Sequence, residues 1–197
     1  PAASPQTYRQ GRAQAVRAAL GNEAKGRWFA HQVDRLPATY LNSTPPEQIA
    51  ADLRLLHGLP DDEINAQGAY QAETETVQFT IATRERVTPG IFHKLTGALS
   101  SQGLEILSAE INTLGDGLVI DRFAVRDPDY GGPPPAERLE QVARALATSL
   151  RQPSGKPPRF RRLWRPGGDR PPALPPAQNR VETDNSTSET CTIFDIF

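Results

Sequence analysis

The segment from Thr76 to Asp127 constrains the fold more than any other part of the chain. In order it reads VQFTIAT, RERVTPG, IFHKLTGALSSQG, LEILSAEINTLGDG and LVIDRFAVRD. These pieces are typical of a strand, a Gly-containing turn, an amphipathic helix, a second strand with a tight hairpin turn, and a third strand. Helix and strand patterns mixed in this way predict an α+β fold.

The helix of this segment has a start and a stop signal. Thr88 suits the cap, Pro89 the first helical position, and Gly90 lets the backbone approach another group closely. Gly103 is placed to end the helix in a left-handed conformation. One face of the helix is apolar and carries Ile91, Leu95, Ala98 and Leu99.

The strands differ in how much of their surface is apolar. In the first strand Val77, Phe79 and Ile81 alternate with polar residues, which predicts one buried face. The second strand runs from about Leu104 to Thr113, and Gly115-Asp116-Gly117 suits a hairpin turn. The third strand is apolar on both faces, with Val119, Phe123 and Val125 on one and Leu118, Ile120 and Ala124 on the other. Another domain or subunit is therefore expected to cover its far face.

The rest of the sandwich lies further along the chain. Residues 136–150 predict a second amphipathic helix, and the best candidate for a fourth strand is Arg180 to Asp184. We therefore predict a ferredoxin-like βαββαβ sandwich. Four residues are expected to meet in its interior: Phe79, Leu95, Phe123 and Leu146.

The N-terminal residues 1–70 predict a helical segment. Helices are expected from Arg12 to Leu20, from Glu23 to Arg35, and after Thr44-Pro45-Pro46-Glu47, which has capping-box spacing. The predicted organisation is residues 1–70 helical, 71–151 the sandwich core, 152–179 a linker, 180–188 the fourth strand, and 189–197 the first strand of a second, truncated domain. The chain has no methionine and ends in an apolar strand, so we expect a fragment of a longer protein.

Residues 152–179 hold eight prolines and six Lys or Arg residues, a composition typical of an extended connector. Within it RFRRLWRP interleaves arginine with Phe160 and Trp164. This run fits either a patch that docks phosphates or an acidic partner, or a linker whose aromatic residues pack on a neighbouring domain.

The ordered motifs resemble the ACT domain, and more narrowly the first of two ACT domains in the bifunctional PII uridylyltransferase/uridylyl-removing enzymes. The matching pieces are Pro89 to Phe92, Gly97 to Leu99, Gly103-Leu104, Ala109 to Thr113, Asp116-Gly117 and Asp121 to Val125. Many ACT domains carry Asp two residues before this Pro, and the residue here is Val87.

The resemblance implies a glutamine-sensing regulatory segment of an enzyme that uridylylates and deuridylylates the PII protein. It implies an effector site lined by Thr88, Pro89, Gly90, Ile91, Ser108 and Glu110, completed by a neighbouring ACT domain or a homodimer partner. It also implies a cytoplasmic location, and Mg²⁺ and UTP as needs of the parent enzyme alone. Two alternatives remain: Pro-Gly merely starts a helix, or the sandwich is a structural or dimerisation module without a small ligand.

No catalytic centre is expected in this chain, so whether it belongs to an enzyme rests on the parent. An Asp-x-Asp pair after a Gly-Ser turn is absent, and no histidine is followed by Asp. His57 near Asp61 and Asp62 fits a helix C-terminus better than a metal site. Cys191 fits a core position, and one cysteine fits a reducing compartment. A net charge of −1 and the lack of a long apolar run predict neither a nucleic-acid nor a membrane partner.

Overall fold

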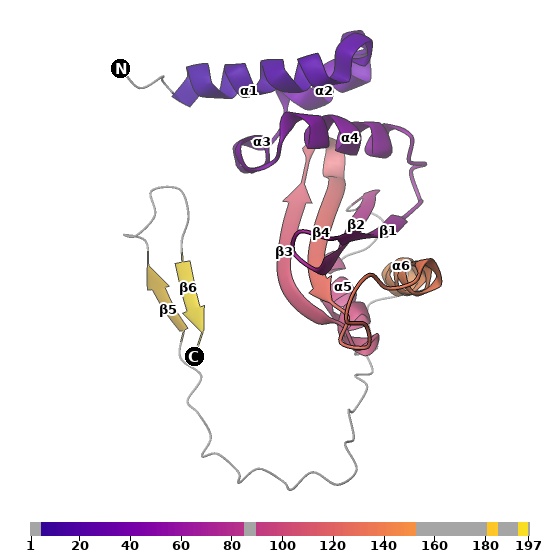
Figure 1. The fold of residues 1–197 in the computed structure, drawn as a ribbon. Coiled ribbons are helices and arrows are strands. Elements are labelled where there is room, and N and C mark those ends of the chain that lie inside the picture. Colours follow the sequence, from indigo (N-terminus) through magenta and orange to yellow (C-terminus); the bar gives the residue numbers. More distant parts are fainter. Residues whose placement is uncertain (1–4, 85–89, 153–180, 185–192, 197) are drawn as a thin grey trace, which may run out of the picture. The chain divides into compact units, whose positions relative to one another are not determined.

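A computed structural model describes residues 5–84, 90–152, 181–184 and 193–196 (Figure 1). The chain divides into two compact units, residues 1–161 and 162–197. In the second unit β5 (Val181–Asp184) pairs antiparallel with β6 (Ile193–Ile196). All other elements described here belong to the first unit.

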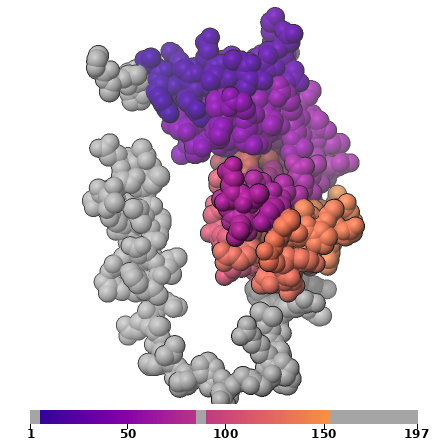
Figure 2. All heavy atoms as spheres, viewed as in Figure 1, coloured from indigo at the N-terminus to yellow at the C-terminus, as the bar shows by residue number. Residues whose placement is uncertain are grey.

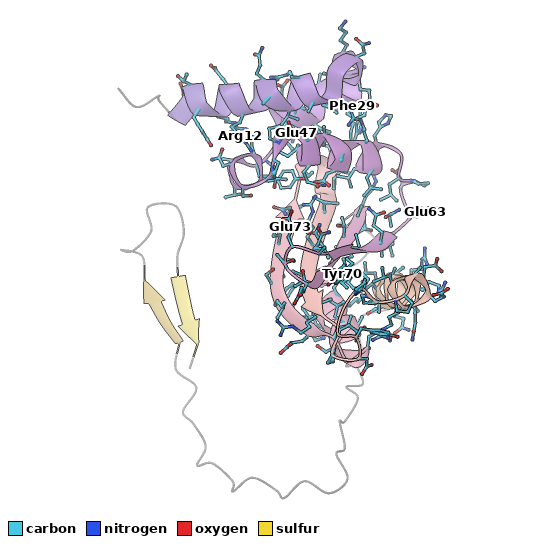
Figure 3. All side chains as sticks on the ribbon, viewed as in Figure 1. Arg12, Phe29, Glu47, Glu63, Tyr70 and Glu73 are labelled. Carbon is cyan, nitrogen blue, oxygen red and sulfur yellow. The ribbon has the colours of Figure 1, made fainter. Side chains whose placement is uncertain are left out.

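The first unit begins with a helical layer. It comprises α1 (Pro5–Leu20), a 3₁₀ turn (Gly21–Lys25), α2 (Arg27–Asp34), α3 (Ala38–Ser43) and α4 (Pro46–His57). The expected capping box at Thr44 does not form, since α4 begins at Pro46 without a side-chain cap. Thr44 is extended (φ −103°, ψ 133°), the conformation that a following proline favours. Instead its carbonyl accepts a hydrogen bond from Arg12 of α1 at 2.5 Å (Figure 3).

The sandwich has a four-stranded antiparallel sheet in the order β1-β2-β4-β3. The strands are β1 (Asn65–Gln71), β2 (Thr76–Arg84), β3 (Glu105–Thr113) and β4 (Leu118–Arg126). Two helices, α5 (Ile91–Ser101) and α6 (Ala136–Arg151), pack on one face. The α+β ferredoxin-like prediction is confirmed.

The source of the fourth strand differs from the expectation. The edge beside β2 is occupied by β1, which lies at the end of the range expected to be helical (residues 1–70), whereas Val181–Asp184 pairs with Ile193–Ile196. A tight hairpin orders few residues before its ends meet, so β1 reaches this edge at low entropic cost. The sequence NAQGAYQ does not predict a strand, because it lacks β-branched residues and has a glycine at its centre.

Two cores lie on opposite faces of the sheet. The predicted interior is confirmed, since Phe79, Leu95, Phe123 and Leu146 share one cluster beneath α5 and α6. On the other face Ala82, Leu118 and Ile120 join the core of the helical layer. The expected cover for the far face of β4 is therefore the chain's own N-terminal helices, which Figure 2 shows as one body over the sandwich.

The turns after α5 and before β4 follow the sequence signals, whereas α5 begins at Ile91 with Gly90 as its N-cap, later than the start expected at Thr88 and Pro89. Gly103 is left-handed (φ 79°), and the Leu104 N–H donates to the Leu99 carbonyl at 3.2 Å, which closes the helix end. The hairpin turn from Gly115 to Gly117 places Asp116 (φ 61°) and Gly117 (φ 68°) in the left-handed region. This turn is held against α2, where Gln32 donates to Asp116 at 2.9 Å.

Candidate functional site

The predicted effector corner lies where α5 begins, although Val87, Thr88 and Pro89 are outside the described residues. Gly90 is the N-cap of α5 in the left-handed conformation (φ 74°, ψ 35°), and no side chain caps this helix. A Cβ added to Gly90 would meet no atom of the described residues within 4 Å, its chain neighbours aside. The corner between Gly90 and Ile91 therefore combines open space with the first N–H groups of a helix, which favour an anionic group.

The structure does not bring Ser108 and Glu110 to this corner. They pair with Ala124 and Arg122 of β4, so their side chains lie on the sheet face that carries Arg122, opposite α5. Residues on the α5 face of β3 are Ala109, paired with Phe123, and Ile111, paired with Asp121. A bulge between Ile106 and Ser108 adds one residue and moves the alternation by one position.

Three exposed apolar side chains, which we call the apolar strip, lie on the first turn of α5 and on β3. Its members are Phe92, Leu107 and Ile111, which are 51%, 44% and 47% exposed. The Phe92 ring stacks on Phe123 with centroids 6.2 Å apart. Within the described sheet β3 pairs only with β4, so its other edge offers N–H and C=O groups to a further strand.

Asp121 is a buried carboxylate on the α5 face of β4, and the sequence analysis named it in a motif but gave it no role in the site. It is fully buried, its Oδ1 accepts the Asn112 N–H at 3.1 Å, and its Oδ2 has no hydrogen-bond partner among the described residues. Burial raises its pKa to about 6, and the Asn112 bond lowers it only in part. The sequence signal for a buried carboxylate was the position of Asp121 between Val119 and Phe123, on a face of the third strand that is otherwise apolar.

The opposite face of β4 carries a buried polar cluster that the sequence analysis also missed. Asp52 of α4 accepts hydrogen bonds from Tyr40 of α3, from Arg122 of β4 and, at 3.0 Å, from Gln48. Burial lowers the pKa of Arg122, but the hydrogen bonds and charges of Asp52 and Tyr40 together raise it above its usual value. Burial and the Asp52 charge raise the pKa of Tyr40 well above its usual value. We call these four residues the Arg122 cluster. Arg122 and Asp52 form an ion pair between the sheet and the helical layer, and the neutral Tyr40 and Gln48 donate hydrogen bonds to Asp52.

Known proteins similar to this chain share one name. No protein-family model matches the sequence. The chain is 32% identical over 119 residues to an enzyme of Rhodospirillum rubrum, covering 55% of the chain and 11% of that enzyme. It is 28% identical over 147 residues to an enzyme of Zymomonas mobilis, covering 70% of the chain and 15% of that enzyme. Both are named bifunctional uridylyltransferase/uridylyl-removing enzyme.

The chain is related to these enzymes. A third relative, from Novosphingobium aromaticivorans, bears the same name and is 25% identical over 117 residues. The chain spans only 11% to 15% of the length of these uridylyltransferase/uridylyl-removing relatives. The resemblance to the uridylyltransferase/uridylyl-removing enzymes is thus confirmed, and it concerns one short segment of much longer enzymes.

The histidine weighed as a metal ligand lies in an aromatic stack in this relative of the uridylyltransferases. The His57 ring centroid is 4.9 Å from that of Trp28 and 4.8 Å from that of Phe29, whose side chain is labelled in Figure 3. Over the part of the chain that the structure describes, no three His, Cys, Asp or Glu side chains are grouped to hold a metal ion. None of the described helices is both long and apolar enough to cross a bilayer.

Proposed function

We propose that this chain is a regulatory ACT-type segment of an enzyme that uridylylates and deuridylylates the PII protein. The observation that carries the proposal is a ferredoxin-like sandwich in a chain related to the uridylyltransferase/uridylyl-removing enzymes. Mg²⁺ and UTP then belong to catalytic domains elsewhere in the parent enzyme. The sandwich acts on those domains by changing its packing when an effector binds.

Glutamine is the effector that we propose for the corner at Gly90. Its α-carboxylate fits the free N–H groups at the start of α5, and open space at Gly90 lets a ligand approach the backbone. Ile111 lies on the same face of the neighbouring edge strand, so it replaces Ser108 and Glu110 as the β3 residue beside the ligand. A second ACT domain placed along β3 completes the site.

The test is the glutamine response of the intact parent enzyme carrying Gly90→Val. Valine at this left-handed position strains the backbone and fills the open corner. We expect the variant to keep uridylylation without glutamine but to lose the switch to uridylyl removal. The matched control is Gly131→Val, at another glycine with open space. A Gly90→Val enzyme that switches normally, or a folded wild type that gives no binding heat with glutamine, contradicts the proposal.

The second candidate is a dimerisation module without a small ligand, and the exposed apolar strip on β3 favours it. Under this alternative Ile111→Glu lowers self-association in sedimentation experiments, and Gly90→Val leaves regulation unchanged. The control is Ser108→Glu, which adds the same charge to the opposite face of the same strand. A protein that is monomeric at all concentrations contradicts this second function.

A further inference from the structure

Arg122 lies at the margin of the helical layer. On the face of β4 that carries Arg122, Leu118 and Ile120 belong to the core beneath the helices, whereas Ala124 is half-buried. Arg122 stands between these two regions with a side chain only 7% exposed. Arg122 is therefore the last residue of β4 that the helical layer covers. An apolar residue at this position would continue the apolar series of Leu118 and Ile120, but the chain buries a guanidinium there.

The guanidinium of Arg122 faces two carboxylates from different elements. Its Nη2 donates to Asp52 of α4, whose side chain is 3% exposed. Its Nη1 is buried, has no hydrogen-bond partner among the described residues, and lies 3.9 Å from Oε2 of Glu110. Glu110 is directly opposite Arg122 in the β3–β4 pairing, and its side chain is 65% exposed.

The two carboxylates are held very differently. Asp52 accepts three hydrogen bonds, from Tyr40, Gln48 and Arg122, and is fixed inside the molecule. Among the described residues the Glu110 side chain makes only the long contact to Arg122, and it lies on β3, whose other edge is free within the described sheet. Any strand, cation or ligand ammonium that arrives along β3 therefore meets Glu110 directly and Asp52 only through Arg122.

We propose that Glu110, Arg122 and Asp52 form a relay that couples occupancy of the β3 edge to the attachment of the helical layer. A cationic group at the edge draws the Glu110 carboxylate away from Arg122. The buried Nη1 then has no anion nearby, so it costs more to keep the guanidinium of Arg122 buried beneath the helical layer. This cost favours opening of the contact between α4 and β4. The coupling works whatever the effector is, so it does not depend on glutamine binding.

Amide hydrogen exchange of the 197-residue chain tests the relay through Glu110→Gln. We expect the amides of α3 and α4 to exchange about two- to five-fold faster, as for the loss of a partly exposed ion pair. Amides of α6, on the other side of the sheet, serve as the internal reference and keep their rates. The matched control is Glu105→Gln, because Glu105 also lies on β3 and pairs with an arginine of β4, Arg126, at 3.0 Å.

A combined variant separates the relay from a local effect of the substitution. In Tyr40→Phe/Asp52→Leu/Arg122→Met, which has no charge left to relay, Glu110→Gln is expected to change no rate. If that background does not fold, Arg122→Lys replaces it, since one ammonium cannot span both carboxylates and the effect of Glu110→Gln must shrink. The relay is refuted if Glu110→Gln behaves like Glu105→Gln, or if its effect is undiminished in the altered backgrounds.

Discussion

At the scale of single residues, Asp121 and Arg122 are neighbours whose side chains enter opposite layers. Arg122 finds a carboxylate, a tyrosine and a second carboxylate within the molecule. Asp121 finds one backbone N–H and no counter-charge among the described residues. The charge of Arg122 is thus balanced inside the molecule and that of Asp121 is not. Removing the charge of Arg122 is expected to destabilise the fold, whereas removing that of Asp121 is expected to stabilise it.

Asp121→Asn is expected to stabilise the protein more at pH 7 than at pH 4. The pKa of Asp121 is raised from 3.8 to about 6 in the folded state, so the native carboxyl holds its proton more tightly than the unfolded one. The stability from that proton is present below pH 4 and is lost as the pH rises through 6. The amide stays neutral, so its advantage should grow by about 2 kcal/mol from pH 4 to pH 7.

Urea unfolding at several pH values measures this advantage. Asp62→Asn, at an exposed loop position, is the matched control and should show no such gain. A difference between Asp121→Asn and wild type that stays constant with pH would show that Asp121 is ionised without penalty in the native state.

Arg122→Met alone is expected to destabilise the protein by about 3–5 kcal/mol, because it leaves Asp52 charged and buried without its cation. The variant Tyr40→Phe/Asp52→Leu/Arg122→Met removes every charge of the pair and should recover most of this loss. Chemical denaturation of Arg122→Met, of Asp52→Leu and of the variant that combines them gives the coupling energy between Arg122 and Asp52. The triple variant also removes the Tyr40 hydroxyl, which would otherwise lose its acceptor. Strictly additive losses would show that the ion pair is not energetically coupled.

At the scale of elements, β1 depends on one close approach. Gly68 lies directly opposite Phe79 in the β1–β2 pairing, and a Cβ on Gly68 would lie 2.5 Å from the Phe79 ring. The ring therefore lies over the glycine backbone, and β1 completes the sheet without adding a large side chain at this point. The glycine that weakened the strand prediction is the residue that allows the strand to pack.

Gly68→Val should cost about 1–3 kcal/mol, because Phe79 must leave its place in the core to avoid the new side chain. Thermal unfolding followed by circular dichroism measures the loss. Ala69→Val, at the next position on the exposed face, is the control and should be close to neutral, since valine suits a strand. Equal stability of the two variants would contradict the packing of Phe79 against Gly68.

At the scale of the whole first unit, one sheet serves two cores. The helical layer completes its interior with Ala82, Leu118 and Ile120 of the sheet, while α5 and α6 cover the other face. Because β2 and β4 are shared, opening either layer exposes apolar surface of the same strands. The helical layer and the sandwich are therefore expected to unfold together.

Ile120→Ala tests this shared sheet by removing volume from the core under the helices. We expect a loss of about 2–4 kcal/mol, with both layers melting in one shifted transition. Trp28 fluorescence, in a Trp164→Phe background, follows the helical layer, and hydrogen exchange of α6 follows the sandwich. Separate transitions for the two probes would show that the layers are independent domains.

Much of the fold was predictable because its signals are local. Alternation in Val77–Ile81, the apolar face of α5, the Gly103 stop and the hairpin at Gly115–Gly117 all depend on neighbours in sequence. The alternation predicted a strand but only one buried face, whereas β2 is buried on both because the helical layer covers the other. Of the candidate site, the sequence placed the start of α5 within two residues of the observed first helical residue, Ile91. It gave no face for Ser108 and Glu110, which lie on the sheet face that carries Arg122. A single bulge at the start of β3 decides the alternation of that strand, and the sequence has no marker for it.

The sequence alone determined the order of elements from β2 to α6, the two apolar faces of β4 and the relationship to the uridylyltransferase/uridylyl-removing enzymes. Only the tertiary structure decided which segment flanks β2, what covers the far face of the sheet, and that Arg122 meets Asp52 across 70 positions of sequence. The reason is physical. The periodicity of helices and strands depends on residues close in sequence. Which distant segments pair depends on the apolar surface that the whole chain can bury and on the entropy lost in closing its loops.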